Sequence, residues 1–397
     1  MLSVSERLAA LSPSETLAMS QKSAELKALG IDVINLSVGE PDFTTPKHIK
    51  DAGKKAIDDD FSFYSPVPGF LSLRNAICEK LKKENKLEFT PDQIVCSNGA
   101  KQSVCNVLLS IAGRGDEVII PAPYWVSYPE MVKLAEGKSV IVSAGIAQDF
   151  KISPEQLENA ITPRTKAMIL CSPSNPTGSV YTRSELKGLA DVLAKHPDMV
   201  VISDEIYEHI NYTGRHESLA QFENIRERTV IVNGISKGYA MTGWRLGWIA
   251  APKQIAAACN KLQGQYTSGA CSIAQKAAEA AYLGDQSCVA EMRSAFERRK
   301  NLVVKLARQS NGLKVNEPAG AFYIFPDCSA YYGKSYNGRT ITDSSDLAMY
   351  LLEEGHVACV GGAAFGAPEC IRMSYATSDE NLQEAFGRIA IALDKLG

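Results

Sequence analysis

The sequence lacks any long apolar run: nowhere in its 397 residues is there a stretch near the about 18 consecutive apolar residues that a membrane-spanning helix needs. Its first residues, MLSVSERLAALSPSE, include acidic side chains and no continuous apolar segment, so they fit neither a secretory nor a transit peptide. We therefore expect a cytoplasmic protein with no membrane partner.

An excess of positive charge is also lacking, because 42 lysine and arginine residues face 45 aspartate and glutamate residues, for a net charge of −3. Nucleic acids are bound by basic surfaces that neutralise phosphates. We therefore expect no nucleic-acid partner. The remaining composition is ordinary, with 45% hydrophobic residues, and a chain of this length has room for two coupled domains.

Paired cysteines of the kind that bind metals or exchange disulfides are absent from the sequence. The ten cysteines show no CxxC spacing, and several, such as Cys96 and Cys171, lie in apolar runs where a thiol behaves as a small hydrophobic group. The five histidines do not form a zinc-ligand spacing with them. We interpret the cysteines as reduced and structural, and we expect no metal site.

What is present, in the middle of the chain, is a recurring pattern: a short β-branched run, a polar or glycine-rich turn, and a longer helical stretch. KAMILCSPSNPTG, MVVISDEIYEHI and TVIVNGISKGYA are examples. Runs such as VVIS and VIVNG are apolar at successive positions, which is typical of strands covered by helices on both faces. The pattern predicts an α/β fold with a mostly parallel sheet.

After about residue 285 the pattern changes. The amphipathic stretch EMRSAFERRKNLVVKLA precedes short apolar runs such as FYIFPD and IRMSYA, and the chain closes on the helical LQEAFGRIAIALDKL. Together with a helix before INLSVGEPDF, these segments predict a smaller α+β unit built from both termini. We expect a large domain over residues 48–285 and a small domain over residues 1–47 and 286–397.

In open α/β sheets, ligands bind outside the carboxyl ends of the strands, so the residues that follow each apolar run are the candidates for a site. A lysine there, once desolvated, can lose its proton and form an imine with an aldehyde, and Lys237 is our candidate. Eight residues later, Arg245 can give a phosphate two parallel hydrogen bonds. A helix that begins near Ala100 favours the same phosphate through its dipole and free N–H groups.

Other strand-end residues suit an aromatic ring. An ionised Asp204 keeps a neighbouring pyridine nitrogen protonated, which makes the ring an electron sink. Tyr207 and Asn175 can hydrogen-bond a phenolic oxygen of that ring, and Trp125 offers a flat face for stacking. Each residue alone has a simpler interpretation, such as a solvated loop lysine, a helix N-cap or a turn. Together they supply every group that a phosphorylated pyridine aldehyde needs.

At this point the sequence resembles a known family, the class I aminotransferases, and within it the bacterial aspartate aminotransferase subgroup. The matching motifs follow one another in order along nearly the whole chain: GEPDF at 39–43, YSPVPGFLSLR at 64–74, PAPYWVSYPE at 121–130, SPSNPTG at 172–178, SDEIYE at 203–208, SKGYAMTGWRLGW at 236–248 and RMSYATS at 372–378. The resemblance implies fold type I of the pyridoxal 5'-phosphate (PLP) dependent transferases, with a mostly parallel seven-stranded sheet in the large domain.

The resemblance also implies a homodimer with shared active sites, and it assigns roles to matching residues. Lys237 would form the Schiff base with PLP and act as general acid and base. The implied cofactor-binding residues are Asp204 at the ring nitrogen, Asn175 and Tyr207 at the ring oxygen, Trp125 on the ring face, and Gly99, Ala100, Lys101, Arg245 and the partner's Tyr64 at the phosphate. The implied substrate-binding residues are Arg372, Asn175, Trp125, Lys101 and the Gly39 amide.

In the aspartate-specific branch of the subgroup, a lysine at the position of Lys101 contributes to binding a distal carboxylate, which favours aspartate and glutamate as substrates. The implied reaction is a ping-pong transfer from L-aspartate to 2-oxoglutarate, giving oxaloacetate and L-glutamate. Aromatic, alanine or prephenate aminotransferases stay open, because Lys101 can also be a solvated residue. So does a PLP carbon–sulfur β-lyase on the same fold. A PLP-binding sensor of a transcription regulator is disfavoured, because no helix-turn-helix segment fits before residue 35.

Overall fold

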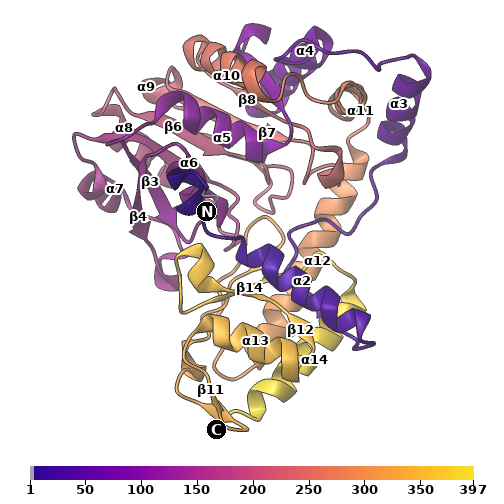
Figure 1. Ribbon diagram of the computed structural model, residues 1–397, viewed down its shortest axis with the longest axis vertical. Helices are drawn as coiled ribbons and strands as arrows, with labels where there is room; N and C mark the ends of the chain where they lie inside the picture. The colour runs from indigo at the N-terminus through magenta and orange to yellow at the C-terminus, as the bar shows by residue number, and fades with distance from the viewer. Residues whose placement is uncertain (1–3) are drawn as a thin grey trace.

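The computed structural model describes residues 4–397. Its larger part is built on a single seven-stranded sheet (Figure 1). The strands lie in the order β2 (Ile94–Ser97), β8 (Gly247–Ala250), β7 (Thr229–Gly234), β6 (Val200–Asp204), β5 (Thr165–Cys171), β3 (Glu117–Ala122) and β4 (Lys138–Ser143). Only β8 runs antiparallel to its neighbours. The predicted mostly parallel sheet is confirmed.

Helices cover both faces of this sheet, which explains the continuous apolar runs. One face carries α5 (Ala100–Ile111), α6 (Ser127–Leu134) and α10 (Lys253–Tyr266); the other carries α3 (Lys47–Asp58), α4 (Leu71–Lys80), α7 (Pro154–Ala160), α8 (Arg183–Ala194) and α11 (Ser272–Leu283). In β7, Ile231 packs in the core beside α4 and α11, whereas Val230 and Val232 pack beside α5 and α10. Successive residues therefore each need an apolar side chain.

The smaller part combines segments from the two ends of the chain. It holds α2 (Glu15–Ala28), α13 (Ser344–Glu354) and α14 (Asp379–Asp394), with the antiparallel sheet β13 (Val360–Gly361), β14 (Ile371–Ser374) and β9 (Tyr323–Ile324). Near the N-terminus, β1 (Ile34–Asn35) pairs in parallel with β12 (Val357–Ala358). The helix α12 (Ser287–Gln309) runs from the larger part into the smaller one (Figure 1). The predicted small α+β unit made from both termini is confirmed.

The first described residues lie against the larger part of the molecule. There α1 (Glu6–Ala9) contacts α6, and the Ser12 backbone N–H donates to the Glu130 carboxylate at 2.8 Å. The domain limits expected at residues 47/48 and 285/286 stay a prediction. Within residues 4–397, none of the helices is both long enough and apolar enough to cross a membrane.

Candidate active site

Most of the predicted site residues surround one cavity of about 280 Å³ at the carboxyl ends of the central strands. The predicted residues that line it are Gly39, Ala100, Lys101, Trp125, Asn175, Asp204, Tyr207, Lys237, Arg245 and Arg372. Residues from the smaller part, on β14 and after β1, close one side of it. Two predicted residues are not in the lining: Gly99 lies directly before α5, and Tyr64 lies on the surface with 97% of its area exposed.

Lys237 follows β7 and its amine faces the loop after β1. The Lys237 Nζ donates to the Gly39 carbonyl oxygen at 2.7 Å. Burial lowers the pKa of Lys237 to about 8. The nearby guanidiniums of Arg372 and Arg245 also lower this pKa, and the carboxylate of Glu40 opposes the shift. An amine with this pKa is neutral in about one tenth of molecules at pH 7, a far larger fraction than for an ordinary lysine, as a nucleophile or general base requires.

Asp204 ends β6 in a buried position, 4% exposed. The Tyr128 hydroxyl donates to Asp204 Oδ2 at 2.6 Å. Burial raises the pKa of Asp204 to about 6, while the Tyr128 hydrogen bond opposes that rise. Tyr128 was not among the predicted site residues, although it lies three residues after Trp125 at the start of a helix, where residues spaced by three share a face.

A chain of hydrogen bonds connects the predicted ring-oxygen and substrate residues. The Tyr207 and Tyr323 hydroxyls are 2.9 Å apart, and Asn175 Nδ2 donates to the Tyr207 hydroxyl at 3.4 Å. Arg372 Nη1 in turn donates to Asn175 Oδ1 at 3.0 Å. Tyr323 was also missed: it lies in β9, within FYIF, which is indistinguishable by sequence from an ordinary buried strand.

Arg372 carries a buried positive charge. It is 2% exposed, its Nη2 donates to the Ser37 carbonyl at 2.6 Å, and the rings of Tyr323 and Phe365 lie 4.7 and 4.9 Å from its guanidinium. Its Nε has no hydrogen-bond partner, and no carboxylate within residues 4–397 forms an ion pair with it. Because a buried charge is costly without a counter-ion, this position calls for an anionic ligand.

A second anion-binding position lies where α5 begins. Gly99 is the N-cap residue of α5 with φ +88°, and a Cβ built on it would lie 2.3 Å from Arg245 Nη2. Arg245 donates to the carbonyls of Thr242 and Asn98, at 2.8 and 3.1 Å. The guanidinium thus lies directly beside the free N–H groups of the helix start, and the absence of a side chain at Gly99 makes this approach possible.

The remaining predicted residues complete the cavity wall. The Lys101 ammonium lies 5.0 Å from the centre of the Trp125 ring. Burial, and then the charge of Arg245, lowers the pKa of Lys101. Gly39 packs so tightly that a Cβ on it would lie 2.3 Å from the Tyr323 hydroxyl oxygen. Tyr64 does not line the cavity of its own chain, so its expected role at a partner's phosphate site stays a prediction.

The donor set fits a phosphorylated pyridine aldehyde together with an acidic substrate. Lys101, Lys237, Arg245 and Arg372 bring four basic side chains to the cavity, and Asp204 is the one carboxylate in its lining. The excess of cations suits a phosphate and one or more carboxylates. The unpartnered Arg372 Nε and the free helix start provide two separate anion positions, with the amine and the buried carboxylate of Asp204 available for the ring.

Ser236, directly before Lys237, is the central residue of GISKG at 234–238, which matches the G-x-S-x-G pattern of hydrolases. A hydrolase of that kind needs a histidine hydrogen-bonded to the serine. In the described part of the chain, none of the hydrogen bonds of the histidines involves Ser236. The pattern is therefore a coincidence of letters in the lysine turn.

The chain is similar to known proteins along nearly its whole length. The model of the family "Aminotransferase class I and II" matches residues 31–389. An aspartate/prephenate aminotransferase from Cereibacter sphaeroides is 50% identical over 97% of this chain and 97% of its own. The crystal structure of the aspartate aminotransferase from Rhizobium meliloti superposes with a TM-score of 0.97 at 41% identity, covering 100% of both chains. That of Thermus thermophilus aspartate aminotransferase with maleate gives a TM-score of 0.92 at 41% identity, covering 99% of this chain and 100% of the other. The chain belongs to the class I and II aminotransferases.

Proposed function

We propose that the protein is a PLP-dependent aspartate aminotransferase, which transfers the amino group of L-aspartate to 2-oxoglutarate and releases oxaloacetate and L-glutamate. The observation that carries this proposal is the buried guanidinium of Arg372, without a counter-ion, in the same cavity as the low-pKa amine of Lys237 and the cation of Lys101. An amine for the cofactor and two cations for a dicarboxylate are what the reaction requires.

In this proposal the chain holds PLP at four points. Lys237 would attach the cofactor through its amine, Asp204 would pair with the ring nitrogen, and Asn175 and Tyr207 would donate to the ring oxygen. The start of α5 and Arg245 bind the phosphate, which the dipole of α5 also favours. When bound, PLP supplies an electron sink for the electron pair left on the substrate Cα.

Lys237 also moves the proton. With PLP bound, the Lys237 Nζ would accept the proton from the substrate Cα and would hold it for donation in the second half of the transfer. The low pKa of Lys237 supports this role, because a neutral amine accepts a proton without first losing one. The Gly39 carbonyl, 2.7 Å from Nζ, provides a fixed acceptor that orients the amine.

Two cations select the substrate. Arg372 would bind the α-carboxylate through two parallel hydrogen bonds, one from the Nε that now has no partner. Lys101 would pair with the distal carboxylate. The Thermus thermophilus relative was solved with maleate, a small dicarboxylate, which supports a dicarboxylate as the ligand here. Closure of the smaller part, which carries Arg372, would exclude water from the reaction.

We further propose a cytoplasmic homodimer in which the Tyr64 hydroxyl reaches the phosphate of the partner's site. Tyr64 and Phe63 support this assembly, since they are 97% and 81% exposed and adjacent in the chain. Large side chains so fully exposed are typical of surfaces covered by a partner.

A second substrate, prephenate, is favoured by the name of the Cereibacter sphaeroides relative.

The test of the proposed function is the absorption spectrum of the purified protein before and after addition of L-aspartate, with Lys237→Ala as the control. We expect the cofactor band to shift to the pyridoxamine form and 2-oxoglutarate to restore it. A band that responds to prephenate, aromatic or sulfur amino acids but not to aspartate would overturn the substrate, and the absence of any band after PLP is added would overturn the cofactor.

A further inference from the structure

A buried polar network lies behind the turn that carries Asp204 and Tyr207, outside the cavity. We call it the Glu208 network, and it consists of Lys80, Asn85, Glu208 and Asn233. Their exposed fractions are 3%, 2%, 7% and 3%, and none of the four lines the cavity. Charges in such positions are costly unless they are paired and hydrogen-bonded, so the arrangement of this network is specific.

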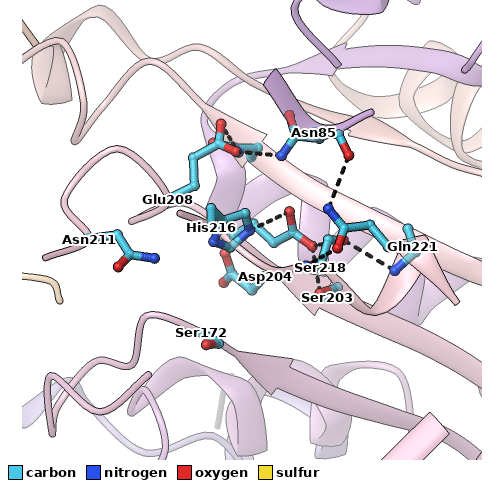
Figure 2. Close-up of polar contacts among 12 residues, drawn as sticks. Asn85, Ser172, Ser203, Asp204, Glu208, Asn211, His216, Ser218 and Gln221 are labelled. Carbon is cyan, nitrogen blue, oxygen red and sulfur yellow. Dashed lines mark hydrogen bonds and ion pairs between the residues drawn. The ribbon is translucent and has the colours of Figure 1, made fainter. Parts of the chain in front are cut away.

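Glu208 is the centre of the network. Its Oε1 accepts a hydrogen bond from Asn233 Nδ2 at 2.9 Å and another from the Lys80 ammonium, and its Oε2 accepts from Asn85 Nδ2 at 2.9 Å. Lys80 also donates to Asn85 Oδ1 at 2.8 Å. Figure 2 shows Asn85 turned toward Glu208. Burial disfavours the carboxylate, but the charges of Lys80, His209 and His216 and the Asn85 hydrogen bond together outweigh it and hold the pKa of Glu208 far below the usual value.

The network joins three elements at the active site. Lys80 ends α4, Glu208 directly follows Tyr207 in the turn after β6, and Asn233 lies in β7, four residues before Lys237. The Glu208 backbone N–H closes the turn by donating to the Glu205 carbonyl at 2.9 Å. A shift of the Glu208 carboxylate would therefore displace Tyr207 on one side and the strand leading to Lys237 on the other.

Two neighbouring contacts reinforce the connection to Lys237. A Cβ built on Gly238, the residue after Lys237, would lie 2.6 Å from Nδ1 of His209, so the His209 ring packs directly against the lysine turn. His209 Nε2 lies 3.0 Å from Glu84, and Glu84 lies 3.5 Å from the Lys80 ammonium. Lys80 is thus connected to the turn that carries Lys237 a second time, through Glu84 and His209.

A cation site is the alternative interpretation, since Glu208 lies close to Glu84 and His209, and also to Glu205 and His216. The Lys80 ammonium already contacts the carboxylate that the two groups share. The charge that a bound cation would supply is therefore provided by the chain itself, which favours a structural ion pair over a metal site.

We propose that Glu208 is a positioning residue for the transamination, a proposal that rests on the function inferred above. Through Asn233 and its own turn, the carboxylate of Glu208 fixes Tyr207 and Lys237 relative to each other. The two groups would act on adjacent positions of the bound ring, Lys237 at the aldehyde carbon and Tyr207 at the phenolic oxygen, and Lys237 Nζ lies 6.0 Å from the Tyr207 ring centre. Their separation therefore decides whether the proton transfer and the ring-oxygen hydrogen bond occur together. Small misplacements of such groups cost up to about 10²-fold in rate.

The test compares Glu208→Gln, Asn233→Ala and the double variant in the full-length, PLP-loaded protein. We expect each single variant to lower kcat about tenfold with KM nearly unchanged, and the double variant to be no slower than either single one, because both break one connection. We also expect the pH midpoint of the bound cofactor's absorption band to rise, because a displaced Tyr207 donates less well to the ring oxygen. If Glu208→Gln does not fold, Asn233→Ala carries the test.

Glu117→Gln is the matched control, because it removes another buried carboxylate, 3% exposed, which pairs with Arg164 at the start of β3 and belongs neither to the cavity lining nor to the Glu208 network. It should keep the wild-type kcat and band midpoint. The free energy of unfolding in urea and the PLP affinity of each apoprotein are measured alongside. Three results would overturn the positioning role: a changed unfolding free energy with unchanged kcat and midpoint, an equal loss of kcat in Glu117→Gln, or additive losses of kcat in the double variant. A wild-type protein without transamination would instead overturn the proposed function.

Discussion

Replacing Tyr128 by phenylalanine tests whether the carboxylate of Asp204 is tuned by its hydrogen bond. The substitution keeps the aromatic ring and removes only the hydroxyl that donates to Asp204 Oδ2 at 2.6 Å. Burial already holds the pKa of Asp204 at about 6, and the Tyr128 hydroxyl keeps it from rising further. Its loss must therefore raise the pKa of Asp204 and reduce the ionised fraction at neutral pH.

The magnitude follows from the energy of that hydrogen bond. A hydrogen bond to a charged group contributes about 1.5–3 kcal/mol, which corresponds to a pKa rise of about one to two pH units. With a pKa of about 6, Asp204 is about nine-tenths ionised at pH 7; after the rise, the fraction is about one half to one tenth. Because pairing with the protonated ring needs the anion, PLP affinity at pH 7 should fall about twofold to tenfold. The loss should disappear above about pH 9.

The assay is a titration of the apoprotein with PLP, monitored by absorbance. It is repeated at pH values from about 5 to about 9, which span the expected pKa values of Asp204 in the two proteins. Tyr181→Phe is the control, because that buried hydroxyl accepts a hydrogen bond from the Ile152 backbone N–H at 2.9 Å and Tyr181 is not part of the cavity lining. The PLP affinity of Tyr128→Phe should converge with that of wild type at high pH, and the PLP affinity of Tyr181→Phe should match wild type at every pH. Superimposable pH profiles for Tyr128→Phe and wild type would refute the coupling between Tyr128 and Asp204.

Four further substitutions test the proposed roles. Lys237→Ala should retain folded protein but lose at least about 10²-fold in half-transamination rate, measured by stopped-flow absorbance; an unchanged rate would remove Lys237 from the proton transfer. Arg372→Lys should raise the KM for aspartate about 10²-fold, since lysine cannot form the two parallel hydrogen bonds, and an equal KM would contradict carboxylate binding there. Lys101→Gln should lower the kcat/KM for aspartate more than that for alanine in competition assays. Equal losses of kcat/KM for the two substrates would argue against a role of Lys101 in binding a distal carboxylate. Tyr64→Phe should lower PLP retention during dialysis; full retention would count against a shared site.

Local patterns in the sequence were sufficient to predict the sheet and several of the residues that line the cavity. Successive apolar residues in β7 predicted burial on both faces, and Ile231 and Val232 do pack into different cores. Because parallel strands bring their carboxyl ends to one edge, residues as far apart as Asn175 and Lys237 were predicted to meet without any knowledge of the structure, and both line the cavity.

The sequence could not indicate Tyr323 or the Glu208 network. Tyr323 lies in an apolar strand of the smaller part, and its hydroxyl contacts Tyr207 only because that strand folds back over the sheet. Likewise, SDEIYE gave no sign that Glu208 points away from the cavity toward Lys80, which is 128 residues distant in the chain.

There is a physical reason why some of these features could be predicted from the sequence and others could not. Hydrophobic periodicity and strand ends are local, so the sequence by itself determined the α/β fold, the edge of the sheet that carries the site, and the amine, carboxylate and guanidinium that meet there. Whether a buried charge is left open for a ligand, as in Arg372, or neutralised by the chain, as in Glu208, depends on which distant groups pack against it. Only the tertiary structure decided that difference, because it alone places the counter-ions.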